Sequence, residues 1–148
     1  MSDKTAKICA IDLFCGVGGV TRGLLDAGID VIAGFDIESS AKQAYEENNI
    51  RPNGEKARYI QKSVTELTKK DITDLIGSKT KRKKEKTKFL LAGCAPCQPF
   101  SRYSSRYRKE GHTDNKWRLL YSFERLVRET LPDIVSMENV PNLIHENV

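Results

Sequence analysis

The stretch ICAIDLFCGVGG, residues 8–19, decides the fold class of this chain. Residues 8–14 form an apolar run, which predicts a buried strand. The glycines that follow predict a tight turn, and residues 20–27 predict a helix that ends at Gly28, a residue type typical of helix C-termini. A strand, a glycine turn and a helix in this order indicate the first unit of an α/β fold.

The rest of the chain repeats this alternation of strands and helices. Ser40 and Gln43 have the spacing of a capping box at the start of the second helix. Pro132 ends the last helix, whose apolar pattern begins at Leu119. We predict an α/β fold with a doubly wound, mostly parallel sheet, which gathers ligand-binding residues at the carboxyl ends of its strands. The further strands are expected at residues 31–35, 58–61, 89–93 and 133–138, and the further helices at 40–45, 64–76 and 119–127.

Length and composition fit a single domain of 148 residues with a net charge of +5. Residues 79–88 hold seven basic residues and one acidic residue, so the rest of the chain is close to neutral. We interpret residues 78–88 as a flexible lysine-rich loop, and this charge alone does not predict DNA binding. No apolar run approaches the ~20 residues of a membrane span. Residues 1–7 do not resemble a secretory signal, and the four cysteines indicate reduced thiols in a cytoplasm.

The glycine turn, together with Asp36 at the end of the second strand, predicts a binding site for a small molecule. Glycines let the backbone approach a ligand closely, and a carboxylate twenty residues after Gly16 can accept hydrogen bonds from both ribose hydroxyls. The spacing differs from the dinucleotide fingerprint, which favours an adenosine-containing ligand without a pyrophosphate. The alternative is a turn that needs glycine for steric reasons, with Asp36 as a solvated strand end.

The sequence CAPC at residues 94–97 allows three interpretations. The spacing is that of thiol oxidoreductases, but Pro96 and Pro99 disfavour the helix start that this chemistry uses. A zinc site needs further ligands, and His112 and His145 stand alone in the sequence. A rigid Pro-Cys segment beyond the end of a strand favours a nucleophilic cysteine, with a buried structural thiol as the alternative.

Two further segments are candidates for the same site. Glu138, at the end of the fifth strand, is a candidate general acid, and the alternative is a solvent-exposed strand end. Residues 102–109 interleave basic residues with tyrosines, a pattern typical of contacts with a polyanion but shared by soluble loops. Because residues 94–116 have no hydrophobic period, we predict an active-site loop over residues 98–116.

Three motifs, DLFCGVGG at residues 12–19, PCQPFS at 96–101 and ENV at 138–140, resemble in this order the DNA (cytosine-5) methyltransferase family. The resemblance extends from about residue 8 to the end of the chain, apart from the lysine-rich loop. It implies a Rossmann-like fold, incomplete at its C-terminal side, that binds S-adenosyl-L-methionine. The implied reaction methylates C5 of cytosine in double-stranded DNA, as in restriction-modification, and releases S-adenosyl-L-homocysteine.

The resemblance also implies roles for individual residues. Cys97 would add covalently to C6 of a flipped-out cytosine, and Glu138 would stabilise protonation at N3. Phe14 and Ile37 would pack against the two faces of the adenine, and no metal is implied. The implied cofactor-binding residues are Phe14, Gly16, Gly18, Gly19, Asp36, Ile37, Ser63, Pro96 and Leu119, and the implied substrate-binding residues are Gln98, Ser101, Arg102, Arg106 and Asn139.

The sequence departs from the family pattern at two places. Ser63 stands where the family often has an acidic residue that contacts adenine, and Trp117-Arg118 stand in place of a Gly-Thr pair. Since family members continue beyond residue 148, the resemblance implies a partial catalytic domain that needs a C-terminal half or a second subunit for activity. A non-catalytic cofactor-binding fragment and a tRNA methyltransferase are the alternatives. The implied location is a bacterial cytoplasm, at the nucleoid.

Overall fold

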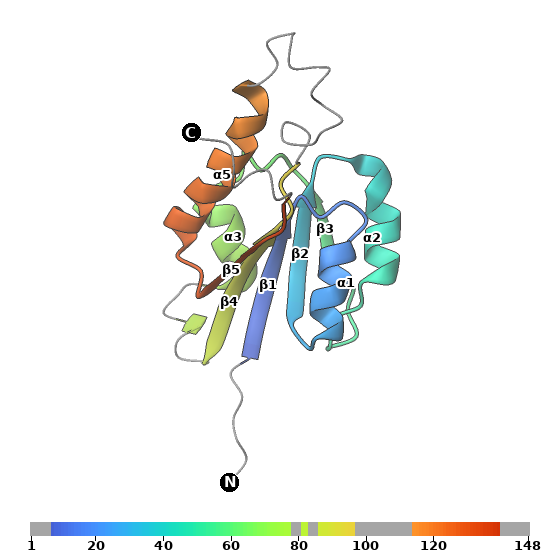
Figure 1. Cartoon of the computed structure of the whole chain (residues 1–148). Coiled ribbons are helices and arrows are strands. Elements are labelled where there is room, and N and C mark those ends of the chain that lie inside the picture. The colour runs from blue at the N-terminus through green and yellow to red at the C-terminus, as the bar shows by residue number, and fades with distance from the viewer. Residues whose placement is uncertain (1–6, 78–80, 83–85, 97–113, 140–148) are drawn as a thin grey trace.

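The computed structural model describes residues 7–77, 81–82, 86–96 and 114–139, the side chains of 114–117 excepted. In this part of the chain five parallel strands form one sheet, in the order β3-β2-β1-β4-β5 (Figure 1). The predicted α/β fold with a mostly parallel sheet is therefore confirmed. The strands are β1 (Lys7–Leu13), β2 (Asp30–Asp36), β3 (Arg58–Gln61), β4 (Thr87–Gly93) and β5 (Ile134–Met137). The helices are α1 (Gly19–Asp26), the 3-10 turn η1 (Ser39–Ala41), α2 (Lys42–Asn48), α3 (Lys69–Ile76) and α5 (Asp114–Thr130).

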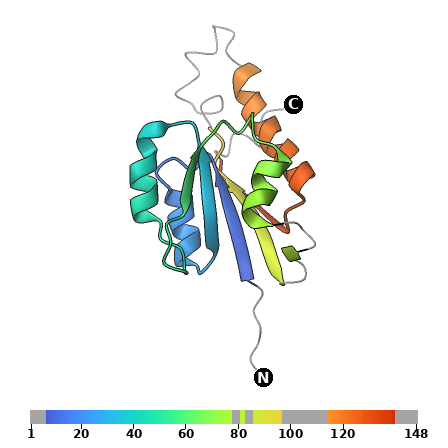
Figure 2. The same cartoon turned by 180° about the vertical axis from the view of Figure 1, so that it is seen from behind.

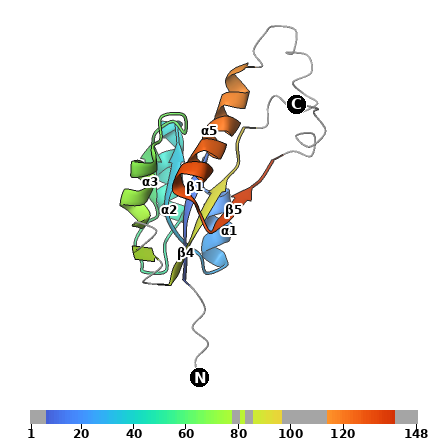
Figure 3. The same ribbon diagram turned by 90° about the vertical axis from the view of Figure 1, so that its left-hand side faces the viewer.

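Helices cover both faces of the sheet, as a doubly wound fold requires. Helices α1 and α2 lie on one face, whereas α3 and α5 lie on the other, which is clearest when Figure 1 is compared with Figures 2 and 3. Strand β1 supplies apolar side chains to both layers because successive residues of a strand point to opposite faces. Ile11 and Leu13 pack in the core under α3 and α5, while Ala10 packs with Leu25 of α1.

The starts of two helices differ from the expectations, each for a local reason. Helix α3 begins at Lys69 and not near Val64, because Thr68 and Asp71 form a capping box at its start. The capping box expected for Ser40 and Gln43 is wrong: the Ser40 backbone N–H and hydroxyl both donate to Glu38.

The two expected loops are shorter than predicted where the structure describes them. Helix α5 begins at Asp114, so the last residues assigned to the loop 98–116 are helical. Strand β4 begins at Thr87, which removes two residues from the expected lysine-rich loop 78–88, and residues 81–82 are helical as well. Hydrophobic periodicity missed both boundaries because polar residues form the first turn of α5 and the start of β4.

Strand β5 lies at the edge of the described sheet and pairs only with β4 there. Its apolar side chains are exposed, and Ile134 retains 42% of its accessible surface. An exposed apolar edge strand is a template for pairing between chains. We therefore expect Ile134→Lys to reduce self-association of the 148-residue chain in concentration-dependent sedimentation experiments. Ile50→Lys, at an equally exposed position outside the named strands, should not reduce it; equal effects of both changes would contradict an edge-specific cause.

Candidate functional site

The candidate site is a cavity of about 180 Å³ at the carboxyl ends of the strands, the upper end of the sheet in Figure 1. Segments that follow β1, β2, β3 and β4 meet there with the N-terminal part of α5. Parallel strands direct all their carboxyl ends to one edge, so residues distant in sequence become neighbours. The cavity is lined by Phe14, Asp36, Ile37, Lys62, Ser63, Val64, Cys94, Pro96 and Leu119.

Six of these nine residues are cofactor-binding residues that the sequence predicts. The structure brings together Phe14, Asp36, Ile37, Ser63, Pro96 and Leu119, which come from five segments of the chain. The three predicted glycines are not part of the lining. Gly16 contacts Asp36 directly, Gly18 is a buried residue of the turn, and Gly19 is the first residue of α1.

The Asp36 carboxylate joins the end of β2 to the glycine turn. Its Oδ2 accepts a hydrogen bond from the Gly16 N–H at 2.8 Å. Its Oδ1 accepts from the N–H groups of Ile37 and Glu38, at 2.7 and 3.1 Å. A carboxylate offers about four lone-pair sites, so these three bonds fix its orientation and leave Oδ2 able to accept from a ligand hydroxyl.

The glycine turn has a backbone conformation that strongly favours glycine at one position. Gly18 has a φ of 93°, and a Cβ built there would lie 2.3 Å from Asn49 Nδ2 and 2.9 Å from Tyr45 Cδ2. Phe14 itself has a φ of 59°, which turns the chain at the point where its ring borders the cavity. Packing of Gly18 against Asn49 and Tyr45, together with the hydrogen bond from Gly16 to Asp36, therefore fixes the shape of the turn.

A buried polar chain lies beneath the turn. The Thr21 hydroxyl of α1 lies 2.7 Å from Asp12 Oδ2, to which it donates, and 3.0 Å from the Tyr45 hydroxyl. Burial raises the pKa of Asp12 to about 6, because only the Thr21 contacts offset the loss of hydration and Asp36 adds repulsion. Burial raises the pKa of the Cys15 thiol too, with further increases from Asp12 and Asp36, so this thiol stays protonated.

The raised pKa of Asp12 predicts a pH-dependent stability. A carboxyl whose pKa is higher in the folded state stabilises the fold below its unfolded value of 3.8, and this contribution is lost as the pH rises through about 6. We expect Asp12→Asn to remove this dependence. The difference in unfolding free energy between the wild type and the variant should change by about 2.4 kcal/mol between pH 4 and pH 7, measured by urea unfolding.

Asp71→Asn provides the matched control for this measurement. Hydrogen bonds from Lys62 lower the pKa of Asp71 to about 2, so its contribution is present above pH 3.8 and is lost only as the pH falls toward 2. The decrease in unfolding free energy caused by Asp71→Asn should therefore be nearly constant between pH 4 and pH 7, where Asp12 titrates. A constant difference for Asp12→Asn over the same window would show that Asp12 is already ionised in the folded state.

Lys62 is a cavity residue that sequence reasoning missed. It follows β3, and its Nζ donates to both carboxylate oxygens of Asp71 at 2.8 and 2.9 Å. Asp71 also caps α3 through Thr68, so the ion pair connects the cavity wall to the start of that helix. The two residues are nine positions apart with no helical or strand spacing between them, and only the fold shows their contact.

Glu138 lies beyond the end of β5, next to the segment that follows β4. Its N–H donates to the Gly93 carbonyl at 3.1 Å, and the Cys94 thiol donates to its Oε2 at 2.8 Å. The Asn139 amide donates to the Ala95 carbonyl at 3.2 Å. The Glu138 side chain is exposed, so the strand end itself does not bury the carboxylate.

Several predicted site residues lie outside the described part of the chain. These include Cys97, the predicted nucleophile, and four of the five predicted substrate-binding residues, Gln98, Ser101, Arg102 and Arg106. Of the predicted substrate-binding residues, only Asn139 is described. That the Cys97 thiol and the Glu138 carboxylate lie in the same site therefore stays a prediction.

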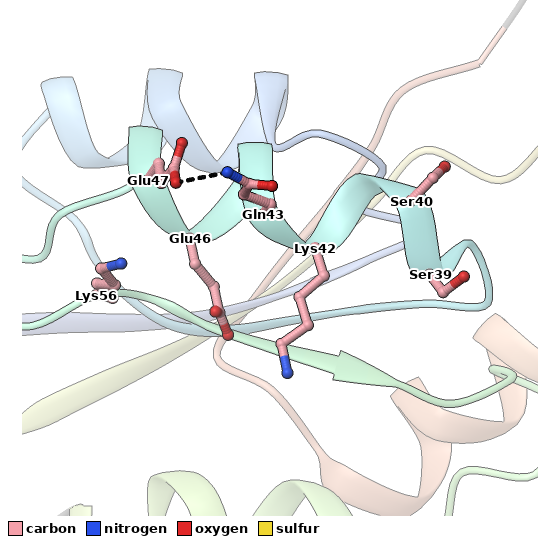
Figure 4. A pocket seen from close by; sticks show the side chains of 7 residues that line it. All are labelled: Ser39, Ser40, Lys42, Gln43, Glu46, Glu47 and Lys56. Carbon is pink, nitrogen blue, oxygen red and sulfur yellow. Dashed lines mark hydrogen bonds between the residues drawn. The ribbon is translucent and has the colours of Figure 1, made fainter.

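A second hollow, of about 440 Å³, lies along η1 and α2 (Figure 4). Two lysines, Lys42 and Lys56, and two glutamates, Glu46 and Glu47, are among its lining residues, so its charges balance, and Gln43 donates to Glu47 at 3.0 Å. Such an open, charge-balanced surface is typical of a solvated helix and indicates no ligand class. Elsewhere too, the described residues contain no group of three or more His, Cys, Asp or Glu side chains placed to hold a metal ion. Among those residues, no helix is both long and apolar enough to cross a bilayer.

Comparison with known proteins gives consistent matches. The sequence model of the family described as C-5 cytosine-specific DNA methylase matches residues 8–148. The chain is 45% identical over 133 residues to the type II methylase M.HgiDII of Herpetosiphon aurantiacus, and this match covers 90% of the chain and 33% of the relative. It is 31% identical over 139 residues to the type II methyltransferase M.HhaI of Haemophilus parahaemolyticus, with coverages of 93% and 35%.

The fold is also similar to a solved structure. The S. pombe Dnmt2 methyltransferase superimposes with a TM-score of 0.63 at 20% identity, over 95% of this chain and 37% of that one. At this identity the likeness shows the fold alone. The chain spans about a third of the length of the curated relatives that it matches.

Proposed function

The chain belongs to the family of C-5 cytosine-specific DNA methylases, and we propose that it forms the cofactor-binding and catalytic part of an enzyme that methylates C5 of cytosine in double-stranded DNA. The observation that supports this most is the composition of the cavity. Six residues that a resemblance to such enzymes assigns to the cofactor line one cavity, although they come from five segments of the chain. A chance resemblance of short motifs would not require them to meet.

The cavity residues have the chemistry that S-adenosyl-L-methionine requires. Phe14 and Ile37 give apolar surface for a flat adenine ring, and Asp36 keeps an acceptor position for a ribose hydroxyl. Ser63 takes the place of the acidic residue that the family often has, and its hydroxyl lies 2.8 Å from that of Thr65. A hydroxyl can accept from the adenine amino group as a carboxylate would, with a weaker hydrogen bond. When bound, the cofactor supplies an activated methyl group.

The proposed reaction begins with a nucleophilic thiol. In the proposed sequence, the Cys97 thiolate forms a bond to C6 of cytosine, while Glu138 stabilises the proton at N3. The electron density moved to C5 would make that carbon the acceptor of the methyl group that bound S-adenosyl-L-methionine would supply, with S-adenosyl-L-homocysteine as the other product. A base finally removes the C5 proton, and the C6–S bond breaks to return the thiolate. Because C6 is inaccessible in stacked DNA, the cytosine has to be flipped out of the duplex.

Substrate contacts are proposed for the segment after Cys97 and for the residue after Glu138. Arg102 and Arg106 supply positive charge for DNA phosphates, and Gln98, Ser101 and Asn139 supply hydrogen-bonding groups for the extruded base. Asn139 already holds the Ala95 carbonyl, so its amide can support the segment that leads to the nucleophile. Such a reaction would take place on bacterial DNA, in the cytoplasm.

Because the relatives are about three times as long, we propose that DNA methylation requires a further C-terminal part or a second subunit. The test combines the chain with that part, in one polypeptide or as two subunits, and measures methyl transfer to duplex DNA from labelled S-adenosyl-L-methionine. We expect activity that Cys97→Ser reduces by at least about a thousandfold, since it removes the group that forms the covalent bond. Duplex DNA with 5-fluorocytosine should trap a covalent complex in the wild type only.

Three results would contradict this proposal in different ways. Transfer to tRNA in place of DNA would change the substrate. Binding of S-adenosyl-L-homocysteine without any transfer would make the chain a non-catalytic cofactor-binding protein. Full activity of Cys97→Ser would remove the proposed nucleophile while leaving the cofactor assignment in place.

A further inference from the structure

Cys94 lies between the cofactor cavity and the carboxylate of Glu138. Its backbone N–H donates to the Leu13 carbonyl at 3.3 Å, which fixes it beside the end of β1. Its half-buried side chain borders the cavity with Phe14 and Pro96. The same thiol lies 2.8 Å from Glu138 Oε2. One side chain therefore contacts both parts of the site that the proposed function uses.

The orientation of Glu138 needs such a contact. The backbone around it is held by the bond from its N–H to Gly93 and by the bond from Asn139 to Ala95. The side chain itself is exposed and extends from the edge strand of the described sheet. A glutamate has three rotatable side-chain bonds, and ordering it costs about 1.5–2 kcal/mol of conformational entropy. A hydrogen bond to the carboxylate end of the side chain opposes this freedom.

We propose that Cys94 is a positioning residue, a cavity residue whose S–H group holds the Glu138 carboxylate in place. This inference rests on the proposed function, because it assigns a role relative to the proposed catalytic carboxylate. A thiol is a weak donor, but its acceptor here is a charged group, which strengthens the bond. The Cys-x-x-Cys spacing thus has an explanation other than redox chemistry or metal binding: the first cysteine orients the acid and the second is the nucleophile.

The first arm of the test measures steady-state kinetics of the complete enzyme with duplex DNA. We expect Cys94→Ala to lower kcat about tenfold and to change KM for S-adenosyl-L-methionine less than about twofold, since the lost bond acts on the reacting base. Cys94→Ser supplies a hydroxyl donor at the same place and should recover most of kcat. Cys9→Ala is the matched control, because Cys9 is a buried thiol in the core under α3 and α5 and should leave kcat unchanged.

A role in packing alone would give a different pattern. In that case Cys94→Ala would raise KM for the cofactor with kcat unchanged, and Cys94→Ser would be no better than Cys94→Ala. Either result would overturn the inference. A serine variant that restores kcat distinguishes a donor from a space-filling group, because both substitutions reduce the volume of the side chain.

The second arm needs no catalytic activity and uses the 148-residue chain in a Cys97→Ser background. The rate of Cys94 alkylation by iodoacetamide is followed by peptide mass spectrometry. Alkylation requires the thiolate, so a neighbouring carboxylate slows it by holding the proton on sulfur and by its negative charge. We expect Glu138→Ala to increase this rate about five- to tenfold, whereas Glu47→Ala, on the exposed side of α2, should not change it.

The two arms separate failure of this inference from failure of the proposed function. An unchanged alkylation rate in Glu138→Ala would show that the thiol does not hold the carboxylate, whatever the enzyme does. A faster rate, combined with no methyl transfer by the wild-type complete enzyme, would remove the proposed function and with it the role of the contact, while the contact itself would stand.

Discussion

Asp36→Ala is expected to weaken binding of S-adenosyl-L-homocysteine to the chain by about 100-fold or more. The change removes the acceptor proposed for the ribose and also the three hydrogen bonds from Gly16, Ile37 and Glu38 that shape the turn. Hydrogen bonds to a charged group contribute about 1.5–3 kcal/mol each, so loss of the ligand contact and of the orientation of the turn readily exceeds about 2.7 kcal/mol. Isothermal titration calorimetry with the purified chain measures the effect.

Asp36→Asn separates the two contributions. An asparagine keeps one acceptor oxygen, so we expect an intermediate loss of affinity. Asp26→Ala serves as the control, since Asp26 forms an exposed ion pair with Arg22 and lies away from the cavity. If Asp36→Ala bound the ligand as well as Asp26→Ala does, the assignment of this cavity to an adenosine cofactor would be wrong.

Gly18→Ala is expected to lower the free energy of unfolding by about 3 kcal/mol or more. The new methyl group would lie 2.3 Å from Asn49 Nδ2, and Asn49 is itself buried, with its amide bonded to the Tyr45 carbonyl. Asn49 and Tyr45 are both buried and cannot move aside without losing their own packing contacts. Overpacking of about 1–3 kcal/mol therefore adds to the backbone strain of an alanine at a φ of 93°. Urea unfolding followed by circular dichroism measures the change.

The neighbouring glycines provide graded controls for this prediction. Gly16 has a φ of 49° but open space where a Cβ would lie, so Gly16→Ala should cost only about 1 kcal/mol of strain. Gly19 has neither a positive φ nor a close neighbour, and Gly19→Ala at the start of α1 should leave stability unchanged or slightly higher. Equal decreases in unfolding free energy at all three positions would show that the turn adjusts to an added methyl group and that the contacts of Gly18 with Asn49 and Tyr45 do not determine the cost.

Local sequence patterns predict which segments form the elements of the core. They predict the ends of an element less well where those ends consist of polar residues. A strand is expected at residues 58–61, and β3 has these bounds, with Tyr59 buried and Ile60 half-buried between exposed ends. The start of α5 escapes prediction because Asp114, Asn115 and Lys116 have no apolar period. The Ser40–Gln43 pattern fails for another reason. The Glu38 carboxylate accepts hydrogen bonds from the Ser40 N–H and hydroxyl, and the Ser40–Gln43 spacing gives no sign of this contact.

The candidate site is predictable where a residue follows a strand directly. Phe14, Asp36 and Ile37 lie at the ends of β1 and β2, and a parallel sheet brings such positions together whatever the loops do. Lys62 and Cys94 are not predicted as cavity residues, because their contacts with Asp71 and Glu138 join residues with no regular spacing. Contacts of this kind depend on the register between strands, which sequence patterns do not give.

The position of β1 in the middle of the sheet has a consequence for the order of folding. Its pairing with β2 joins residues about twenty positions apart, such as Cys9 and Asp30, whereas its pairing with β4 joins residues 80 positions apart, such as Lys7 and Thr87. Closure of the longer segment has the higher entropic cost, and distant pairings slow folding. We therefore expect the β1-α1-β2 unit to form before β4 pairs with β1. During that interval one edge of the first strand is unpaired and open to misassembly.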